Sequence, residues 1–280
     1  MKFWKMHGLG NDYIVIDNRN EKIGSAEAAG LARKLCERRF SIGADGLLLV
    51  ENSSVADVKM RIFNADGSEA EMCGNGMRCF AKYCYENNIA RKKELTIETL
   101  AGIRRTWLTV QGSAVTSVRV DMGAPTLERN KIPIVGAGTF VNEDLQVNGE
   151  HYKATCLSVG NPHCVIFVDS VDDFPVEQVG PRIENHQLFP KRTNVEFAQV
   201  LNRNELKVRV WERGCGETLA CGTGACAAVA AGNMLEKVDS KVTVRLVGGD
   251  LEVEYAEHLF LSGAAEKVFE GKLFEDVQIA

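Results

Sequence analysis

The chain has 280 residues, of which 45% are hydrophobic and 25% are charged, and its formal net charge is −5. This composition argues against a disordered chain, and the lack of a basic excess argues against a nucleic-acid-binding protein. The longest apolar stretches are far too short to span a membrane, and residues 1–17 lack the continuous apolar region of a signal peptide. We therefore expect a globular, cytoplasmic protein of one large or two ordinary domains.

Short β-branched and apolar runs between Gly, Asn and Asp predict a chain rich in strands, with few helices. The predicted strands are Tyr13–Asp17, Leu47–Val50, Val58–Phe63, Leu95–Thr99, Val118–Met122, Cys164–Val168, Leu206–Trp211, Lys241–Val247 and Leu251–Tyr255. The predicted helices are Ser25–Glu37, Gly76–Asn87 and Gly224–Leu235. Ser25 is the expected N-cap of the first helix, because its hydroxyl can accept a bond from an early backbone N–H group.

Nine cysteines lie along the chain, at Cys36, Cys73, Cys79, Cys84, Cys156, Cys164, Cys215, Cys221 and Cys226. An odd number without an export signal does not suggest a disulfide framework. No pair has the C-x-x-C spacing and the few histidines do not cluster near the cysteines, so we do not expect a structural zinc site. Most of these cysteines are expected to be small buried hydrophobic residues.

One sequence pattern occurs twice, at the spacing that separates Cys73 from Cys221. The matched pairs are Phe63 with Trp211, Glu69 with Glu217, Cys73 with Cys221, Gly74 with Gly222 and Gly76 with Gly224, and a weaker upstream echo matches Gly10-Asn11 and Tyr13 with Gly160-Asn161 and His163. The repeat predicts two homologous α/β halves, with a boundary at residues 122–132 where Gly, Pro and Asn cluster. A pseudo-twofold axis would bring both cysteines to one inter-domain cleft, the usual place for a small-ligand site.

Each copy of the repeat places a Cys-Gly-x-Gly turn just before a predicted helix. The positive end of the helix dipole favours the thiolate of such a cysteine. The glycines permit positive φ and close approach of a ligand to the backbone, and the free N–H groups of the first helical turn can bind a carboxylate. Each half therefore offers a reactive thiol beside a carboxylate site.

Two thiols around one carboxylate suit the inversion of the adjacent carbon atom. One group removes the α-proton from one face and the other delivers a proton to the opposite face. Cysteine is suited to both roles because its ordinary pKa, about 8.5, lies close to working pH and can be tuned. The N–H groups that bind the carboxylate would also stabilise the negative charge that develops during proton removal.

The chain resembles the diaminopimelate epimerase family over essentially its full length. The matching segments are Lys5–Asp12, Phe63–Ser68, Met72–Cys79, Gly160–His163, Arg192–Val195, Glu212–Gly214 and Ala220–Gly224. The resemblance implies an α/β (α+β) fold of two pseudosymmetric domains, each a curved, mainly antiparallel sheet wrapped around a central helix, with the active site in the cleft between them. The expected domains are residues 1–122 together with 267–280, and residues 123–266.

The resemblance also implies an activity and a set of site residues. The activity is interconversion of LL- and meso-2,6-diaminopimelate in lysine and cell-wall precursor biosynthesis, by a homodimer that needs no cofactor and no metal. Cys73 and Cys221 would be the catalytic acid/base pair. Gly74, Asn75, Gly222 and Thr223 would hold the reacting carboxylate; Asn11, Asn64, Asn161, Asn194, Glu212 and Arg213 would hold the far amino-acid end; and His163 and Glu212 would tune the thiols.

These roles agree with the chemistry of the far end, which carries a carboxylate and an ammonium group. Arg213 can bind the carboxylate with two hydrogen bonds, and Glu212 can accept from the ammonium group. Two positions depart from the family pattern. Gly46 stands where some members have a glutamine that contacts the substrate, so that contact is absent or replaced. Cys215 stands where a small residue without a thiol is common, and we assign it no role.

Other functions fit the sequence less well. A proline or hydroxyproline racemase of the same architecture would use paired cysteines but would not need Arg213 and the asparagines. A thiol-redox or metal-binding protein would have no use for the two glycine-rich turns, and a metal analysis would identify it. A non-catalytic amino-acid-binding protein would not exchange the substrate's α-proton with solvent. The expected partner is a small diamino dicarboxylic acid, without nucleic acid or membrane.

Overall fold

A computed structural model describes residues 1–274 of the chain. The chain divides into two compact units, Met1–Val120 with Ser262–Ala280 (unit 1) and Asp121–Leu261 (unit 2). Residues 275–280, the last part of the segment that we expect to return to the first half, lie outside the described residues. Over residues 1–274, both units consist mainly of strands, with two helices each, as the sequence predicts for the fold class.

Unit 1 contains a sheet of mixed pairings. Its elements are β1 (Lys2–Gly8), β2 (Asn11–Asp17), α1 (Ser25–Cys36), β3 (Gly46–Glu51), β4 (Val58–Asn64), β5 (Glu69–Ala70), α2 (Gly74–Glu86), β6 (Glu94–Thr99), β7 (Gly102–Gln111), β8 (Ala114–Gly123) and β18 (Glu266–Lys272). Pairing runs from β18 through β1, β2, β3, β4, β6 and β7 to β8. The β2–β3 and β4–β6 pairs are parallel and the others are antiparallel. The short β5 pairs with β4.

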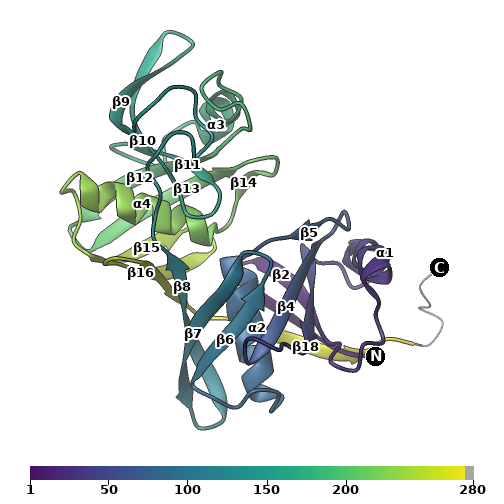
Figure 1. Cartoon of the computed structure of the whole chain (residues 1–280). Coiled ribbons are helices and arrows are strands. Elements are labelled where there is room, and N and C mark those ends of the chain that lie inside the picture. The colour runs from purple at the N-terminus through teal and green to yellow at the C-terminus, as the bar shows by residue number, and fades with distance from the viewer. Residues whose placement is uncertain (275–280) are drawn as a thin grey trace. The chain divides into compact units, whose positions relative to one another are not determined.

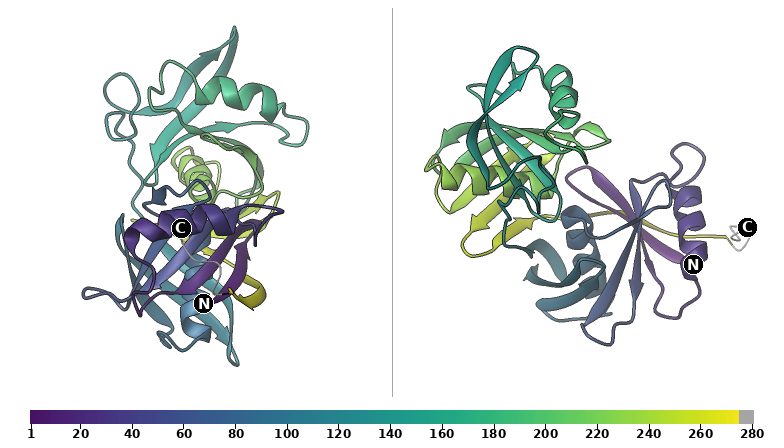
Figure 2. Two further views of the ribbon diagram at one scale, coloured as in Figure 1. Left: turned by 90° about the vertical axis from the view of Figure 1, so that its right-hand side faces the viewer. Right: turned by 45° about the horizontal axis from the view of Figure 1, so that its top comes forward.

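Helix α2 is the central helix of unit 1, and every residue from Gly74 to Tyr85 is buried. Strands β2 and β3 lie between α2 and α1, so both of their faces are covered (Figures 1 and 2). Ile14 and Leu47 face the α1 side, where they pack with Leu31. This double coverage explains why both strands are nearly continuous apolar runs rather than alternating ones.

Unit 2 repeats the same arrangement. Its elements are β9 (Phe140–Val147), β10 (Glu150–Ser158), β11 (Pro162–Phe167), α3 (Val176–Glu184), β12 (Asn194–Asn202), β13 (Glu205–Glu212), β14 (Gly216–Thr218), α4 (Gly222–Met234), β15 (Lys241–Leu246), β16 (Gly249–Tyr255) and β17 (Leu259–Gly263). Pairing runs from β9 through β10, β11, β12, β13 and β15 to β16, with β11–β12 and β13–β15 parallel. Helix α4 is buried throughout from Gly224 to Gly232.

The two units also agree in strand register. Tyr13 of β2 pairs with Gly46 of β3, and His163 of β11 pairs with Asn194 of β12. Gly46 and Asn194 stand at the same spacing as Cys73 and Cys221. The repeat in the sequence is therefore also a repeat of strand pairing. Residues that match in the two sequence copies lie on corresponding strands.

Several predicted helix boundaries were wrong. Gly24, not Ser25, is the N-cap of α1; its backbone N–H donates to the Glu27 carboxylate, and Ser25 is the first helical residue. Helices α2 and α4 begin two residues before the predicted starts, because the cysteines themselves are the N-caps. Helix α3 was not predicted, since Gly180 and Pro181 interrupt its sequence. A Cβ atom on Gly180 would lie 2.6 Å from the Trp211 ring, so close packing on Trp211 explains the glycine.

Candidate active site

Cys73 is the N-cap residue of the buried helix α2. Its backbone is extended, with φ −146° and ψ 121°, and its sulfur accepts a hydrogen bond from the backbone N–H of Gly76 at 3.5 Å. Gly74 and Asn75 are the first two residues of the helix and are buried. The N–H groups of this first turn and the helix dipole both favour negative charge at the cap, on the sulfur or on a bound carboxylate.

Tyr13 of β2 lies directly beside this thiol, although the sequence analysis gave it no role. Its hydroxyl oxygen is 2.9 Å from the Cys73 sulfur and donates a hydrogen bond to Asn11 Oδ1 at 2.6 Å. Asn75 Nδ2 donates to the same Asn11 oxygen at 3.4 Å, and the Cys73 sulfur is 3.7 Å from it. Asn11, Tyr13, Cys73 and Asn75 therefore form one cluster in unit 1.

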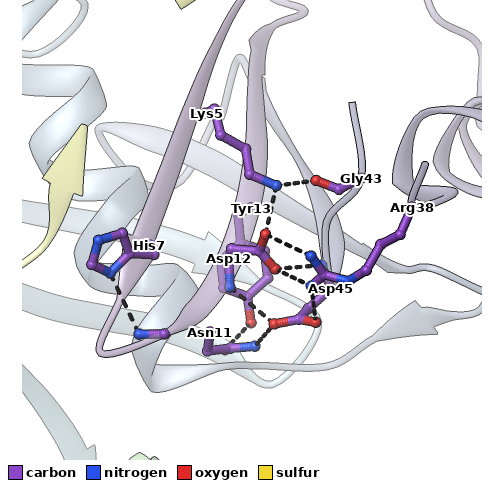
Figure 3. Close-up of polar contacts among 9 residues, drawn as sticks. Lys5, His7, Asn11, Asp12, Tyr13, Arg38, Gly43 and Asp45 are labelled. Atoms are coloured by element: carbon purple, nitrogen blue, oxygen red, sulfur yellow. Dashed lines mark hydrogen bonds and ion pairs between the residues drawn. The ribbon is translucent and has the colours of Figure 1, made fainter. Parts of the chain in front are cut away.

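A network of charged residues holds Asn11 in place (Figure 3). Asn11 Nδ2 donates to Asp45 Oδ2 at 2.8 Å, and Arg38 bridges Asp45 and Asp12 at 2.9 and 2.7 Å. Lys5 lies 2.6 Å from Asp12 Oδ2. Burial raises the pKa of Asp12, but hydrogen bonds from Arg38 and Lys5 outweigh it and lower that pKa overall. The network fixes the Asn11 amide so that its oxygen faces Tyr13 and the thiol.

Asn64 lies at the end of β4, where its Nδ2 donates to Ser68 Oγ at 2.9 Å within an exposed turn. It pairs across the sheet with Gly46 of β3. A Cβ atom on Gly46 would lie 2.8 Å from the Phe63 carbonyl oxygen and 3.2 Å from the Tyr13 ring. A side chain at residue 46 would therefore clash with the Phe63 carbonyl oxygen and crowd the Tyr13 ring.

Cys221 occupies the same backbone setting in unit 2. It is the N-cap of α4, with φ −115° and ψ 111°, and its sulfur accepts from the backbone N–H of Gly224 at 3.4 Å. Gly222 and Thr223 are the first helical residues, and Thr223 Oγ1 is 3.4 Å from the sulfur. Burial, followed by the negative charges of Glu212 and Glu196, raises the pKa of Cys221 well above its ordinary value. These surroundings favour the protonated form of the Cys221 thiol.

A chain of hydrogen bonds leads from Glu196 to this thiol. Glu196 Oε1 is 2.7 Å from His163 Nδ1, and His163 Nε2 is 2.9 Å from Asn161 Oδ1. Asn161 Nδ2 donates to Thr223 Oγ1 at 3.2 Å. The amide oxygen can only accept, so His163 carries a hydrogen on Nε2. The two bonds from His163 to Thr223 both donate toward Cys221, and in the last bond either the Thr223 hydroxyl or the Cys221 thiol can be the donor.

Glu196 was missed by the sequence analysis. It is fully buried on β12, and its Oε2 atom has no hydrogen-bond partner within residues 1–274. A Cβ atom on Gly224 would lie 2.8 Å from Glu196 Oε1, so the glycine leaves room for the carboxylate. A charged residue inside the apolar run from Val195 to Ala198 was the available signal.

Glu212, Arg213 and Asn194 lie together at the end of β13. Glu212 accepts from the Thr218 hydroxyl, and burial raises its pKa. The exposed Arg213 side chain donates to the Lys191 carbonyl oxygen at 3.3 Å. Asn194 accepts from the Arg213 backbone N–H at 2.9 Å and donates to the Pro162 carbonyl oxygen at 2.9 Å. The Asn194 amide thus fixes the backbone that carries Arg213.

The glycines of the two turns do not use the positive φ that glycine permits, because they are helical. Gly76 and Gly224 instead leave space for Tyr13 and Glu196. Of the other cysteines, Cys36, Cys79, Cys84, Cys156, Cys164 and Cys226 are buried, which confirms that most are core residues, and Cys215 is exposed.

Within residues 1–274, no group of three or more His, Cys, Asp or Glu side chains is placed to hold a metal ion. Helices long and apolar enough to cross a bilayer are likewise absent from that part.

Comparison with known proteins places this geometry in a family. The family model for diaminopimelate epimerase matches residues 3–128 and 155–268. The diaminopimelate epimerase of Moorella thermoacetica is 56% identical over 275 residues, covering 97% of this chain and 98% of the relative. That of Methanococcus maripaludis is 47% identical over 277 residues, covering 98% of this chain and 99% of the relative.

Solved structures of lower identity share the fold. A phenazine biosynthesis protein of the PhzF family from Bacillus anthracis matches with a TM-score of 0.73 at 19% identity, covering 98% of this chain and 99% of the other. A probable proline racemase from Agrobacterium radiobacter matches with a TM-score of 0.74 at 15% identity, covering 98% and 93%. Proteins with different names therefore share this fold, and the fold alone does not identify the family. The match to the two diaminopimelate epimerases extends over nearly the whole sequence. The chain therefore belongs to the diaminopimelate epimerase family.

Proposed function

We propose that the chain interconverts LL- and meso-2,6-diaminopimelate, with Cys73 and Cys221 as the two acid/base groups. The observation that carries this proposal is the matched setting of the two sulfurs. Each cysteine caps a buried helix, accepts a backbone N–H three residues on and has a hydroxyl group beside its sulfur. Such a thiol can hold a proton or a negative charge, which an acid/base group must do in turn.

The proposed reaction moves one proton at each face of the substrate carbon. One cysteine, as thiolate, takes the α-proton and becomes a thiol. The other, as thiol, gives its proton to the opposite face and becomes a thiolate. Because burial and the neighbouring carboxylates keep Cys221 protonated, we assign Cys221 as the acid and Cys73 as the base in the form that acts first.

The reacting carboxylate would lie against the first turns of α2 and α4. Gly74 and Asn75 in one unit and Gly222 and Thr223 in the other stand at the helix starts, where backbone N–H groups can donate to a bound anion. These donors would stabilise the charge that moves onto the carboxylate as the α-proton leaves. Rigid helix ends suit this role, because they do not need to reorganise during the reaction.

The far end of the substrate would be recognised by Arg213 and Glu212 together with Asn11, Asn64 and Asn161. The Arg213 guanidinium uses one donor on the Lys191 carbonyl oxygen and retains others for a carboxylate. Glu212 lies beside it and can accept from an ammonium group. Because the Asn194 amide oxygen accepts from the backbone N–H of Arg213, we propose that Asn194 also acts by holding Arg213 in place.

Solvent deuterium labelling tests the reaction. The purified protein is incubated in D2O with LL-diaminopimelate, and early product is analysed for label and stereochemistry. We expect deuterium mainly on the newly formed meso epimer, since the accepting thiol retains the substrate proton. Equal early labelling of substrate and product would contradict two separate groups. L-proline serves as the control substrate, and inversion of proline instead would support a proline-type racemase.

The proposed substrate belongs to lysine and cell-wall precursor biosynthesis, so we propose that the protein works in the cytoplasm. The family resemblance favours a homodimer. Cell fractionation and light scattering of the purified protein measure these two properties separately from the activity.

A further inference from the structure

Tyr13 carries out no role that the family resemblance assigns, yet it makes the shortest polar contact of the Cys73 sulfur among those described. The distance between the two atoms is 2.9 Å, against 3.5 Å for the backbone N–H of Gly76 and 3.7 Å for Asn11 Oδ1. The tyrosine is 5% exposed, so water does not compete freely for its hydroxyl. A buried hydroxyl at this distance from a sulfur contributes directly to the energy of its charged form.

The ring of Tyr13 is placed by two glycines. Cβ atoms added to Gly46 and Gly76 would lie 3.2 Å and 3.4 Å from the ring. Gly46 pairs with Tyr13 across parallel strands, and Gly76 lies in the first turn of α2. The absence of a side chain at residue 46, which the sequence leaves without explanation, thus creates the space for a tyrosine that reaches the thiol.

The hydroxyl has one proton and two neighbouring acceptors. When Cys73 is a thiol, the Tyr13 proton is donated to Asn11 Oδ1 and the S–H group can donate to the tyrosine oxygen. When Cys73 is a thiolate, the tyrosine proton can turn to the sulfur, while Asn11 Oδ1 keeps the hydrogen bond from Asn75. This change needs only rotation about the C–O bond, and the tyrosine keeps its proton throughout.

We propose that Tyr13 is the positioning and charge-stabilising residue of Cys73, and that its hydroxyl turns between Asn11 and the sulfur as the thiol loses and regains its proton. The proposal rests on the proposed role of Cys73 as an acid/base group. Burial, followed by the charge of Cys73, raises the pKa of Tyr13 well above its ordinary value, which keeps the hydroxyl a donor. The proton that leaves Cys73 goes to the substrate carbon, and none is transferred from Tyr13.

The repeat supports the assignment independently. Tyr13 and His163 occupy corresponding positions on β2 and β11, and each donates to the oxygen of the asparagine two residues earlier, Asn11 or Asn161. In unit 2 this partner acts on Cys221 through Asn161 and Thr223. In unit 1 the longer tyrosine reaches the sulfur itself.

The test measures the thiol rather than the reaction. Iodoacetamide alkylation of Cys73 is followed across pH by peptide mass spectrometry in wild type and in Tyr13→Phe. We expect the pH midpoint of Cys73 alkylation to rise by about one unit in Tyr13→Phe. This shift means a tenfold loss of thiolate at a given pH, equivalent to about 1.4 kcal/mol. Other ionisable groups near the site are Asp45, which bonds Asn11, and Cys79 and Arg78 on α2.

Three controls separate the outcomes. The exposed Cys215 is read in the same digests, and its midpoint should not move. Tyr83→Phe removes another buried phenol hydroxyl from α2 and should leave the Cys73 midpoint unchanged. Gly46→Ala keeps the hydroxyl but crowds the ring, so it should raise the midpoint as Tyr13→Phe does, and it carries the test if Tyr13→Phe fails to fold.

An unchanged Cys73 midpoint in folded Tyr13→Phe would overturn the proposal and leave Tyr13 as a packing residue. That result is distinct from failure of the proposed function, which would appear as retained epimerase activity in Cys73→Ala. A raised Cys73 midpoint together with a reduced kcat in Tyr13→Phe, at unchanged KM, supports both the role of Tyr13 and the role of Cys73 as an acid/base group.

Discussion

Cys73 and Cys221 are both N-caps with extended backbones, but different side chains surround their sulfurs. In unit 1, the Cys73 sulfur lies 2.9 Å from the Tyr13 hydroxyl. The Leu48 side chain and the Tyr13 ring both lie against Gly76. In unit 2, the Cys221 sulfur lies 3.4 Å from a threonine hydroxyl at the end of a chain that starts at Glu196. Leu48 and Glu196 are corresponding residues of the repeat.

The difference follows from the aromatic residue on the second strand of each half. A tyrosine has one polar atom, which faces the thiol, so the residue behind it can be apolar. A histidine has two polar ring atoms, and a buried Nδ1 needs its own partner, which Glu196 supplies. Two units with the same backbone arrangement thus hold their thiols among different side chains. The Glu196 charge that accompanies His163 adds to burial and to the charge of Glu212 in raising the pKa of Cys221.

Loss of either sulfur should have the largest effect and tests whether the two units are equally necessary. Cys73→Ala and Cys221→Ala should each lower kcat by at least about a hundredfold, because general acid/base groups contribute about 10²–10⁴ each. Epimerase assays in both directions measure this, with Cys79→Ala as a buried-cysteine control. High residual activity in one variant alone would show that only one thiol transfers protons.

Arg213 marks a second asymmetry, since its counterpart in unit 1 is Ala65. Arg213→Lys loses the bidentate hydrogen bonding of the guanidinium group and should weaken substrate binding by about 1.5–3 kcal/mol. Steady-state kinetics should show a raised KM. Arg203→Lys, which alters a surface ion pair with Asp239, is the matched control. An unchanged kcat/KM in Arg213→Lys would refute its assignment to the far carboxylate.

Glu196→Leu gives unit 2 the residue that unit 1 has at this position. The change leaves His163 Nδ1 without its partner in a buried site and should cost about 1–3 kcal/mol of unfolding free energy. Glu196→Gln can still bond Nδ1 and should cost less. Denaturant unfolding of both variants, with nitrogen NMR of His163, measures the loss and the protonation of the ring. Equal stability of Glu196→Leu and wild type would mean that the pair contributes nothing.

Cys215 should have the smallest effect. It is exposed, and its counterpart in unit 1 is Gly67. Cys215→Ser should change kcat/KM less than about twofold and the free energy of unfolding by less than about 0.5 kcal/mol, as is usual for a surface substitution. A larger loss of activity would give this thiol a part in the unit 2 site that the present assignment omits.

The sequence alone predicted the features that depend on residues close together in the chain. A cysteine, its glycines and the helix that follows are contiguous, so a thiol just ahead of each helix, and its repetition, could be predicted from the printed order. The predicted helix starts were two residues late, because cysteine is not among the usual N-cap residues and was not considered as one. The repeat also indicated two similar halves rich in strands.

Tertiary structure alone decided which side chains surround each sulfur. Tyr13 reaches Cys73 from 60 residues away, and Glu196 reaches His163 from 33 residues away. These contacts depend on strand register and on the face to which a residue points, since a shift of one residue turns a side chain to the opposite face. Gly46 shows the same limit: its lack of a side chain has no evident purpose until the Tyr13 ring is seen against it. Chain order fixes which atoms are neighbours along the backbone, whereas packing across strands decides which polar groups share a proton.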